Sequence, residues 1–145
     1  MKSKMKPIPE GIHTVSPRMF VRGAAIAIEF YQRAFGAIEL GRHADLSGKI
    51  VNAELKLGNS IFSLAEESPE FGNHSPQSLG GATMILTLNV EDADAVWEKA
   101  IAAGAKAVFP LKDQFYGFRQ GRLEDPFGHR WIISTQIEDG SQGER

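Results

Sequence analysis

The sequence predicts an α+β fold made of two tandem βαβββ modules, each forming a curved mixed sheet around a cleft. Two observations support this prediction. A strand, a helix and three further strands are indicated in the same order in both halves of the chain. Landmarks at a strand end, a helix end and a hairpin turn also repeat with offsets of 68 to 70 residues: Val21 and Val90, Gly36 and Gly104, Gly58 and Gly128.

The first module is expected over residues 11–65. Gly11–Val21 is predicted as a strand, and Pro17 within it indicates a sheet edge or a bulge because proline has no N–H to donate. Ala24–Phe35 has the apolar spacing of a helix, which Gly36 ends. The remaining elements are a strand and a hairpin: Ile38–Leu40, and Ile50–Ala65 with its turn at Gly58-Asn59.

The second module is expected over residues 82–137. Ala82–Val90 is predicted as a buried strand, and Asp92 as the N-cap of a helix over Ala93–Ala103. A short strand, Lys106–Phe109, and a closing hairpin follow. The other segments are an N-terminal arm at 1–10, a linker loop at 66–81 and a polar tail at 138–145.

The closing hairpin carries the most informative residues. Asp125-Pro-Phe-Gly128 fits a type I turn, because the Asp125 carboxylate can accept from following backbone N–H groups and Pro126 sets φ. Gly128 supplies the conformational freedom that the fourth position needs. Arg119, on the incoming strand, could pair with Asp125 or with an acid of a ligand, and the alternative is an ordinary hairpin with an exposed arginine.

Composition excludes several classes of protein. The 145 residues are 42% hydrophobic and 23% charged, with a net charge of −2 and no cysteine. The charge balance argues against a nucleic-acid surface. The lack of cysteine excludes disulfides, thiolate catalysis and cysteine-based metal sites. No stretch approaches the roughly 20 apolar residues of a membrane span, and no signal peptide is visible, so we expect no membrane partner and a cytoplasmic location.

Five segments carry a resemblance to a known family: Ala27-Ile-Glu-Phe-Tyr-Gln-Arg-Ala-Phe-Gly36, Val90-Glu-Asp-Ala-Asp94, Ala103-Gly-Ala105, Tyr116-Gly-Phe-Arg119 and Asp125-Pro-Phe-Gly-His129. The chain resembles the vicinal oxygen chelate superfamily, which includes glyoxalase I, bleomycin-resistance proteins, fosfomycin-resistance enzymes and extradiol dioxygenases. The resemblance covers about His13 to Thr135, and the closest subgroup is the metal-poor PhnB-like proteins. It implies the glyoxalase/bleomycin resistance fold and, usually, a homodimer.

Metal-using members of this superfamily hold their ion with His or Glu at four cleft-facing positions. Counting from the shared landmarks places these positions at four residues of this chain: Ser16, Phe62, Ile85 and Ile132. None of these side chains is an imidazole or a carboxylate, the ligands that such a divalent ion needs. No His, Asp or Glu lies within two residues of any of them. We therefore predict no metal and no cofactor.

The leading hypothesis is a protein that binds a small, partly apolar molecule in its cleft. Phe62, Ile85 and Ile132 would then form an apolar floor. Arg18 and Arg130 share the strand parity of the lost ligand positions and could hold an acidic group at the rim, while Tyr116 could stack on the ligand. Together with Ser16, these six residues are the predicted ligand-binding residues.

Two alternatives remain at this level. One is a metal-dependent lyase or dioxygenase with an unconventional site built from His13, Glu54 and His129, or with ligands contributed across a dimer. The other is a structural or regulatory dimer whose cleft is vestigial. Catalytic residues are not identifiable from the sequence, and fold-level analogy alone does not separate these functions.

Overall fold

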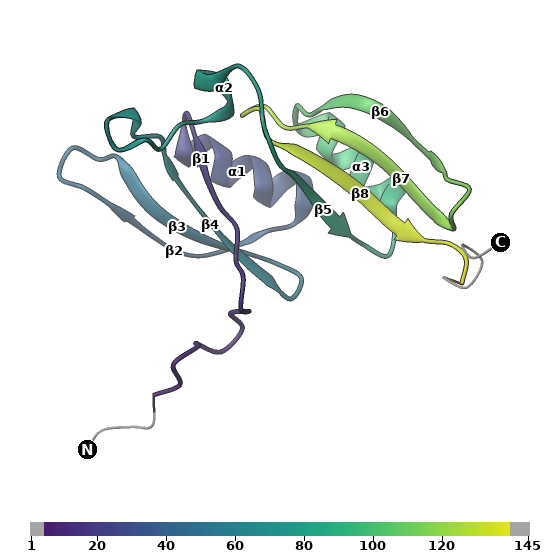
Figure 1. Cartoon of the computed structure of the whole chain (residues 1–145), viewed down its shortest axis with the longest axis horizontal. Helices are drawn as coiled ribbons and strands as arrows, with labels where there is room; N and C mark the ends of the chain where they lie inside the picture. Colours follow the sequence, from purple (N-terminus) through teal and green to yellow (C-terminus); the bar gives the residue numbers. More distant parts are fainter. Residues whose placement is uncertain (1–4, 140–145) are drawn as a thin grey trace.

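The computed structural model describes residues 5–139. The helices and strands alternate in the predicted order (Figure 1). The first half contains β1 (Arg18–Val21), α1 (Ala24–Phe35), β2 (Ile38–Ala44), β3 (Ile50–Leu57) and β4 (Ser60–Glu66). The second half contains β5 (Ile85–Asn89), α3 (Ala93–Ala103), β6 (Lys106–Asp113), β7 (Phe118–Glu124) and β8 (Arg130–Gln136).

Each half forms one four-stranded mixed sheet, with strand orders β1-β4-β3-β2 and β5-β8-β7-β6. In both sheets the first strand pairs in parallel with the last, and the other neighbours are antiparallel. The two topologies are identical, so the predicted α+β fold with two βαβββ modules is confirmed. The predicted edge position is also confirmed, because β1 is the outer strand of its sheet.

The two long helices begin and end at the predicted residues. Gly36 follows α1 and donates its N–H to the Gln32 carbonyl. Its φ is 74°, a value that a residue with a Cβ adopts only at an energetic cost. Asp92 caps α3 by accepting from the backbone N–H of Ala95 at 3.1 Å. Neighbouring residues in the sequence therefore define the C-terminal end of α1 and the N-terminal end of α3.

Helix α1 lies between the two sheets (Figure 1). The ring of Tyr31 on α1 is fully buried and contacts Phe62 of β4 and Trp131 of β8, with ring centroids 5.7 Å away in each case. Phe62 and Trp131 also contact each other at 6.2 Å. The helix-bearing faces of both sheets thus meet around α1, and the opposite faces, here called the open faces, are not brought together within the chain.

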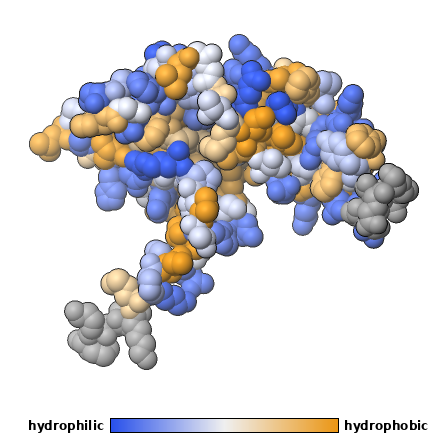
Figure 2. Space-filling view, viewed as in Figure 1, coloured by the Kyte–Doolittle hydropathy of each residue, from blue (hydrophilic) through white to orange (hydrophobic). Residues whose placement is uncertain are grey.

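The segments outside the modules differ from the expectation. The strand predicted over Gly11–Val21 begins only at Arg18, directly after Pro17. The segment before it passes the β3–β4 hairpin, where the His13 ring contacts the Asn59 carbonyl, and the N-terminal end of the described chain then runs out from the modules (Figures 1 and 2). The linker at 66–81 is not a featureless loop, because it contains a 3-10 helix at Pro69–Phe71 and the short helix α2 at Pro76–Leu79. Proline at the start of each of these helices suits a position whose N–H has no helical partner.

Among residues 5–139, no helix is long and apolar enough to cross a membrane.

Candidate functional site

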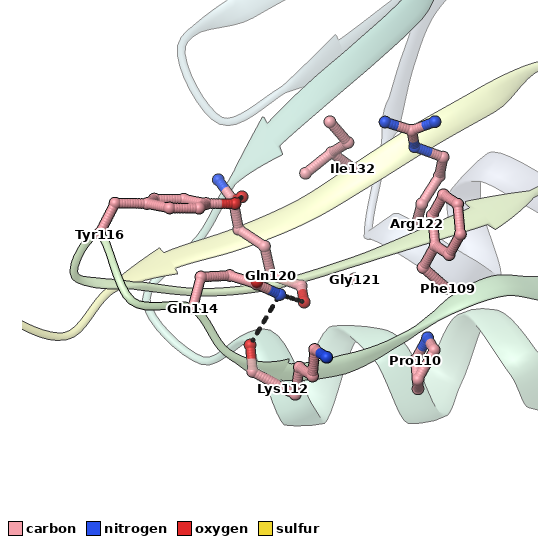
Figure 3. A pocket seen from close by; sticks show the side chains of 9 residues that line it. All are labelled: Phe109, Pro110, Lys112, Gln114, Tyr116, Gln120, Gly121, Arg122 and Ile132. Atoms are coloured by element: carbon pink, nitrogen blue, oxygen red, sulfur yellow. Dashed lines mark hydrogen bonds between the residues drawn. The ribbon is translucent and has the colours of Figure 1, made fainter.

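A pocket lies on the open face of the second sheet, between β6, β7, β8 and the β6–β7 turn (Figure 3). Its volume is about 340 Å³, within the range of small-molecule sites. The lining residues are Phe109, Pro110, Lys112, Gln114, Tyr116, Gln120, Gly121, Arg122 and Ile132. Two of the predicted binding residues, Tyr116 and Ile132, are among them.

An irregularity in β6 shapes one wall of this pocket. Phe109 pairs with Arg122 and Lys112 pairs with Gln120, so β6 has one more residue than β7 between these two pairs. Pro110 lies in this bulge, where its missing N–H leaves no ladder bond unmade. The extra residue moves the β6 backbone against the helix side of β7 and leaves the Phe109 side chain beside Arg122 (Figure 3).

Gly121 is the residue that permits this close approach. A Cβ at this position would lie 2.8 Å from the Leu111 backbone and 2.7 Å from the Trp97 ring of α3. Both contacts are shorter than real Cβ contacts, so any larger residue would push β6 or α3 away. The position of this pocket wall therefore depends on Gly121.

A hydrogen-bonded chain holds the polar residues at one end of the pocket. The Tyr116 hydroxyl donates to Gln120 Oε1 at 2.7 Å, and Gln120 Nε2 donates to the buried Ser134 hydroxyl at 2.9 Å. Gln114 Nε2 donates to the Gln120 carbonyl at 3.2 Å (Figure 3). These partners fix the amide of Gln120 and the orientation of the Tyr116 ring before any ligand arrives.

Arg122 lies outside this hydrogen-bonded chain. Its Nε is buried and makes no hydrogen bond with any residue from 5 to 139. The guanidinium carbon lies 5.2 Å from the centre of the Phe109 ring, a cation–π distance. The neighbouring Arg119 differs in its pairing, because its guanidinium binds Asp94 and Asp113 at 2.9 Å each. Arg122 and Ile132 rise side by side on the open face in Figure 3.

The Asp125 turn has a structural role. As predicted, Asp125 Oδ1 accepts from the backbone N–H groups of Phe127 and His129, at 2.9 and 3.0 Å. Its Oδ2 accepts from the Tyr31 hydroxyl of α1 at 2.5 Å and from Trp131 Nε1 at 2.9 Å. Burial raises the pKa of Asp125, and burial together with this carboxylate raises the pKa of Tyr31 well above its ordinary value. The carboxyl group therefore joins the two modules and is closed to a ligand.

The predicted pairing of Arg119 with Asp125 is wrong. Residues alternate between the two faces of β7, and Arg119 lies on the helix side, where its guanidinium binds Asp94 of α3 through two hydrogen bonds of 2.9 Å. Asp125 is occupied by its four donors, described above. The arginine thus fastens α3 to the sheet and does not reach the pocket.

The other predicted binding residues lie elsewhere. Arg18 and Arg130 line a second, smaller pocket of about 170 Å³ beneath the linker. Arg18 is held on the open face of the first sheet by Asn52 Oδ1 at 2.6 Å, and Arg130 pairs with Glu124 at 3.1 Å. Ile85 is on the open face of the second sheet, in register with Arg130. Ser16 is exposed in the segment before β1.

Phe62 faces the opposite side of its strand from the predicted one. Its ring is 5% exposed and packs on Tyr31 in the core, at the edge of a cavity between the modules. The prediction counted from turn glycine to turn glycine, but the second hairpin turn is longer than the first, which shifts the last strand by one position. The register makes Trp131 the counterpart of Phe62, and Ser63 the counterpart of Ile132.

The residues at the family's metal positions do not fit a divalent metal. With the register corrected, these positions are Ser16, Ser63, Ile85 and Ile132. Within residues 5–139 no group of three or more His, Asp or Glu side chains could hold a metal. The alternative site built from His13, Glu54 and His129 is therefore not formed within the chain. Instead, the rings of His13 and His129 contact the backbone carbonyls of Asn59 and Phe20.

A charged cluster anchors the linker to the first module. The Ser78 hydroxyl, the Ser75 backbone N–H and the Arg22 guanidinium all donate to the Glu67 carboxylate, over 2.6 to 2.9 Å. These hydrogen bonds, that of Ser78 first, lower the pKa of Glu67 to about 2. Glu66, its neighbour, accepts from the backbone N–H groups of Gly23 and Ala24 and so caps α1.

The sequence reasoning missed Arg122, Phe109 and Gln120. For two of them the sequence contained a signal. Gln120 and Arg122 alternate with Gly121 and Leu123 along β7, so they are expected on the same face of the sheet. The bulge that brings Phe109 beside Arg122 leaves no such signal, since only Pro110 indicates an irregularity.

Comparisons with known proteins place this geometry in a family. Residues 11–133 match the family described as Glyoxalase/Bleomycin resistance protein/Dioxygenase superfamily. The uncharacterized protein Rv0887c of Mycobacterium tuberculosis is 39% identical over 133 residues, which cover 90% of this chain and 78% of that protein.

Solved structures show the same fold. TioX from Micromonospora sp. ML1 is 26% identical, with a TM-score of 0.66, over 88% of this chain and 98% of its own. The PhnB protein from Bacillus cereus is 20% identical, with a TM-score of 0.66, over 85% of this chain and 99% of its own, and at that identity shows the fold alone. The chain therefore belongs to the Glyoxalase/Bleomycin resistance protein/Dioxygenase superfamily, the vicinal oxygen chelate superfamily that its sequence resembles.

Proposed function

We propose that the protein binds a small, partly apolar molecule in the pocket on the open face of its second sheet. The single observation that carries this proposal is the combination of an apolar surface with pre-positioned polar groups in one pocket of about 340 Å³. Ile132 and Phe109 supply apolar contact, and the Tyr116–Gln120–Ser134 chain fixes the polar end. Such a mixture is typical of small-molecule sites.

Binding is favoured over metal-dependent lyase or dioxygenase chemistry. The four positions that would hold the ion carry hydroxyl or aliphatic side chains. This chain therefore has no residues at these positions that could bind the metal on which that chemistry depends. The buried acid Asp125 is occupied by four donors and does not line the pocket. A ligand would meet fixed hydrogen-bonding groups, and none of the lining residues is an Asp, Glu, His or Ser.

The proposal includes a homodimer of the PhnB-like type in the cytoplasm. Because the helix-bearing faces meet around α1, the two open faces can be enclosed only by another molecule. A second copy is the commonest such partner among soluble proteins, and it would also cover the exposed edges of the sheets. Sedimentation at micromolar concentration tests this part, and a monomer would refute it.

The binding proposal is tested by a thermal-shift screen of small aromatic and aliphatic compounds on the parent protein and two variants. Ile132→Glu places a carboxylate on the pocket floor and should abolish the shifts. Ile26→Glu changes an exposed isoleucine of α1, outside the pocket, and should leave them unchanged. Compounds that stabilise Ile132→Glu as much as the parent would show that they bind elsewhere.

A further inference from the structure

The pocket on the second sheet carries positive charge without a balancing acid. Arg122 and Lys112 are its two charged residues, and none of the lining residues is an Asp or Glu. The Lys112 ammonium forms no ion pair within residues 5–139. By contrast, Arg130 on the same face is paired with Glu124 at 3.1 Å. The sheet therefore pairs one open-face arginine internally and leaves another without a counter-ion.

The environment of Arg122 makes an unpaired state costly. A half-buried guanidinium with a buried Nε has lost water that could hydrogen-bond to it, and the Phe109 ring on one side cannot accept a hydrogen bond in the guanidinium plane. The other polar groups cannot turn to help, because Tyr116, Gln114 and Gln120 already hydrogen-bond among themselves and with Ser134. Because Nε itself is buried, an acceptor from outside would meet the terminal nitrogens of the guanidinium and supply the negative charge that the sheet lacks.

Resting on the function proposed above, we propose that the ligand is an organic acid with a flat apolar body, and that its carboxylate binds Arg122. A carboxylate matches the guanidinium fork and accepts two parallel hydrogen bonds. The body of the ligand lies over Ile132 toward Tyr116, whose ring is held by Gln120. Lys112 adds positive charge at the rim of the pocket, but its ammonium group is not held in a fixed position relative to the ligand.

The test compares 2-naphthoate with 2-naphthamide, which has the same rings and a neutral head group. Calorimetric titration of the parent should give about ten- to a hundredfold tighter binding of the acid, the range expected for a charge-assisted hydrogen bond. Arg122→Met, which keeps an apolar stem, should reduce the affinity for 2-naphthoate to that for 2-naphthamide. Arg33→Met, at an exposed site on α1 outside the pocket, should change neither affinity.

The outcomes separate this inference from the function on which it rests. If Ile132→Glu weakens both compounds while Arg122→Met leaves the preference for the acid intact, the pocket binds small molecules but Arg122 does not select acids. Equal affinities of the parent for acid and amide would overturn the inference in the same way. If neither compound binds the parent, or if Ile132→Glu changes neither affinity, the proposed binding pocket fails as well. Circular dichroism of each variant confirms that it is folded.

Discussion

Replacing Asp125 with alanine should lower the free energy of unfolding by about 2–4 kcal/mol. The carboxylate accepts four hydrogen bonds, two of them from the buried Tyr31 hydroxyl and Trp131 indole. Each buried donor left without an acceptor costs about 1–3 kcal/mol, so these two together cost about 2–6 kcal/mol. Relief of the desolvated carboxyl group offsets part of this cost. Loss of the acceptor for the buried Phe127 N–H and the part-buried His129 N–H acts in the opposite direction.

A double-mutant cycle separates the Tyr31 contact from the rest. Tyr31→Phe removes one hydrogen bond and should cost about 1–2 kcal/mol. The double variant should cost less than the sum of the single variants, with a coupling of about 1 kcal/mol, because both remove the same bond. Urea unfolding followed by the fluorescence of Trp97 and Trp131 measures all three.

Asp113→Ala is the matched control for this cycle. Asp113 pairs with Arg119 on the surface, with 64% of its side chain exposed, so its loss should cost under about 1 kcal/mol. If Asp125→Ala costs no more than this control, or if the two single effects add fully, then the Tyr31–Asp125 bond does not join the modules.

Three further predictions concern packing, pH and metal. Gly121→Ala should lower the urea midpoint and weaken ligand binding together, because its Cβ would clash with Leu111 and Trp97 at under 3 Å; unchanged stability would contradict the close approach. The pKa of Glu67 is lowered to about 2, so its contribution to stability is complete above about pH 4.5 and is lost as the pH falls toward 2; the urea midpoint of Glu67→Gln should therefore fall less steeply over that range, and parallel curves would refute the assignment. Elemental analysis of dialysed protein should find no stoichiometric zinc, nickel, iron or manganese, and about one ion per chain would overturn the metal prediction.

The helices and the hairpin turns were predictable because their causes are local. Gly36 and Gly104 end the two long helices, Asp92 caps the second, and Asp125 forms its turn with the backbone donors expected of it. The contacts that end these helices, cap the second helix and form the turn lie within five positions of each residue. A single sequence contains that information directly, so the element order and both helix boundaries were predicted correctly.

The pocket was harder to predict because its causes are not local. Arg122 is distinctive through the partner that it lacks, and nothing in the neighbouring sequence shows that Glu124 pairs with Arg130 instead. The orientation of Phe62 depended on the length of a turn in the other module, since one residue of error inverts a strand. Arg119 was assigned the wrong acid because Asp94 is distant in the sequence and adjacent only in the fold.

The two modules have similar core residues but different residues on their open faces, and this contrast connects the open face with function. The cross-strand pair Leu55 and Phe62 in the core of the first sheet corresponds to Leu123 and Trp131 in the second, so the core pairs keep similar size and apolar character. The adjacent open-face pair, Glu54 and Ser63, corresponds to Arg122 and Ile132. Packing against the helices restricts the first kind of position, because any change in volume there costs stability. No such restriction acts on the open face. There the acid Glu54 of the first module corresponds to the base Arg122 of the second, although the modules share one topology. A ligand that binds only one of the modules must therefore distinguish them through these open-face residues.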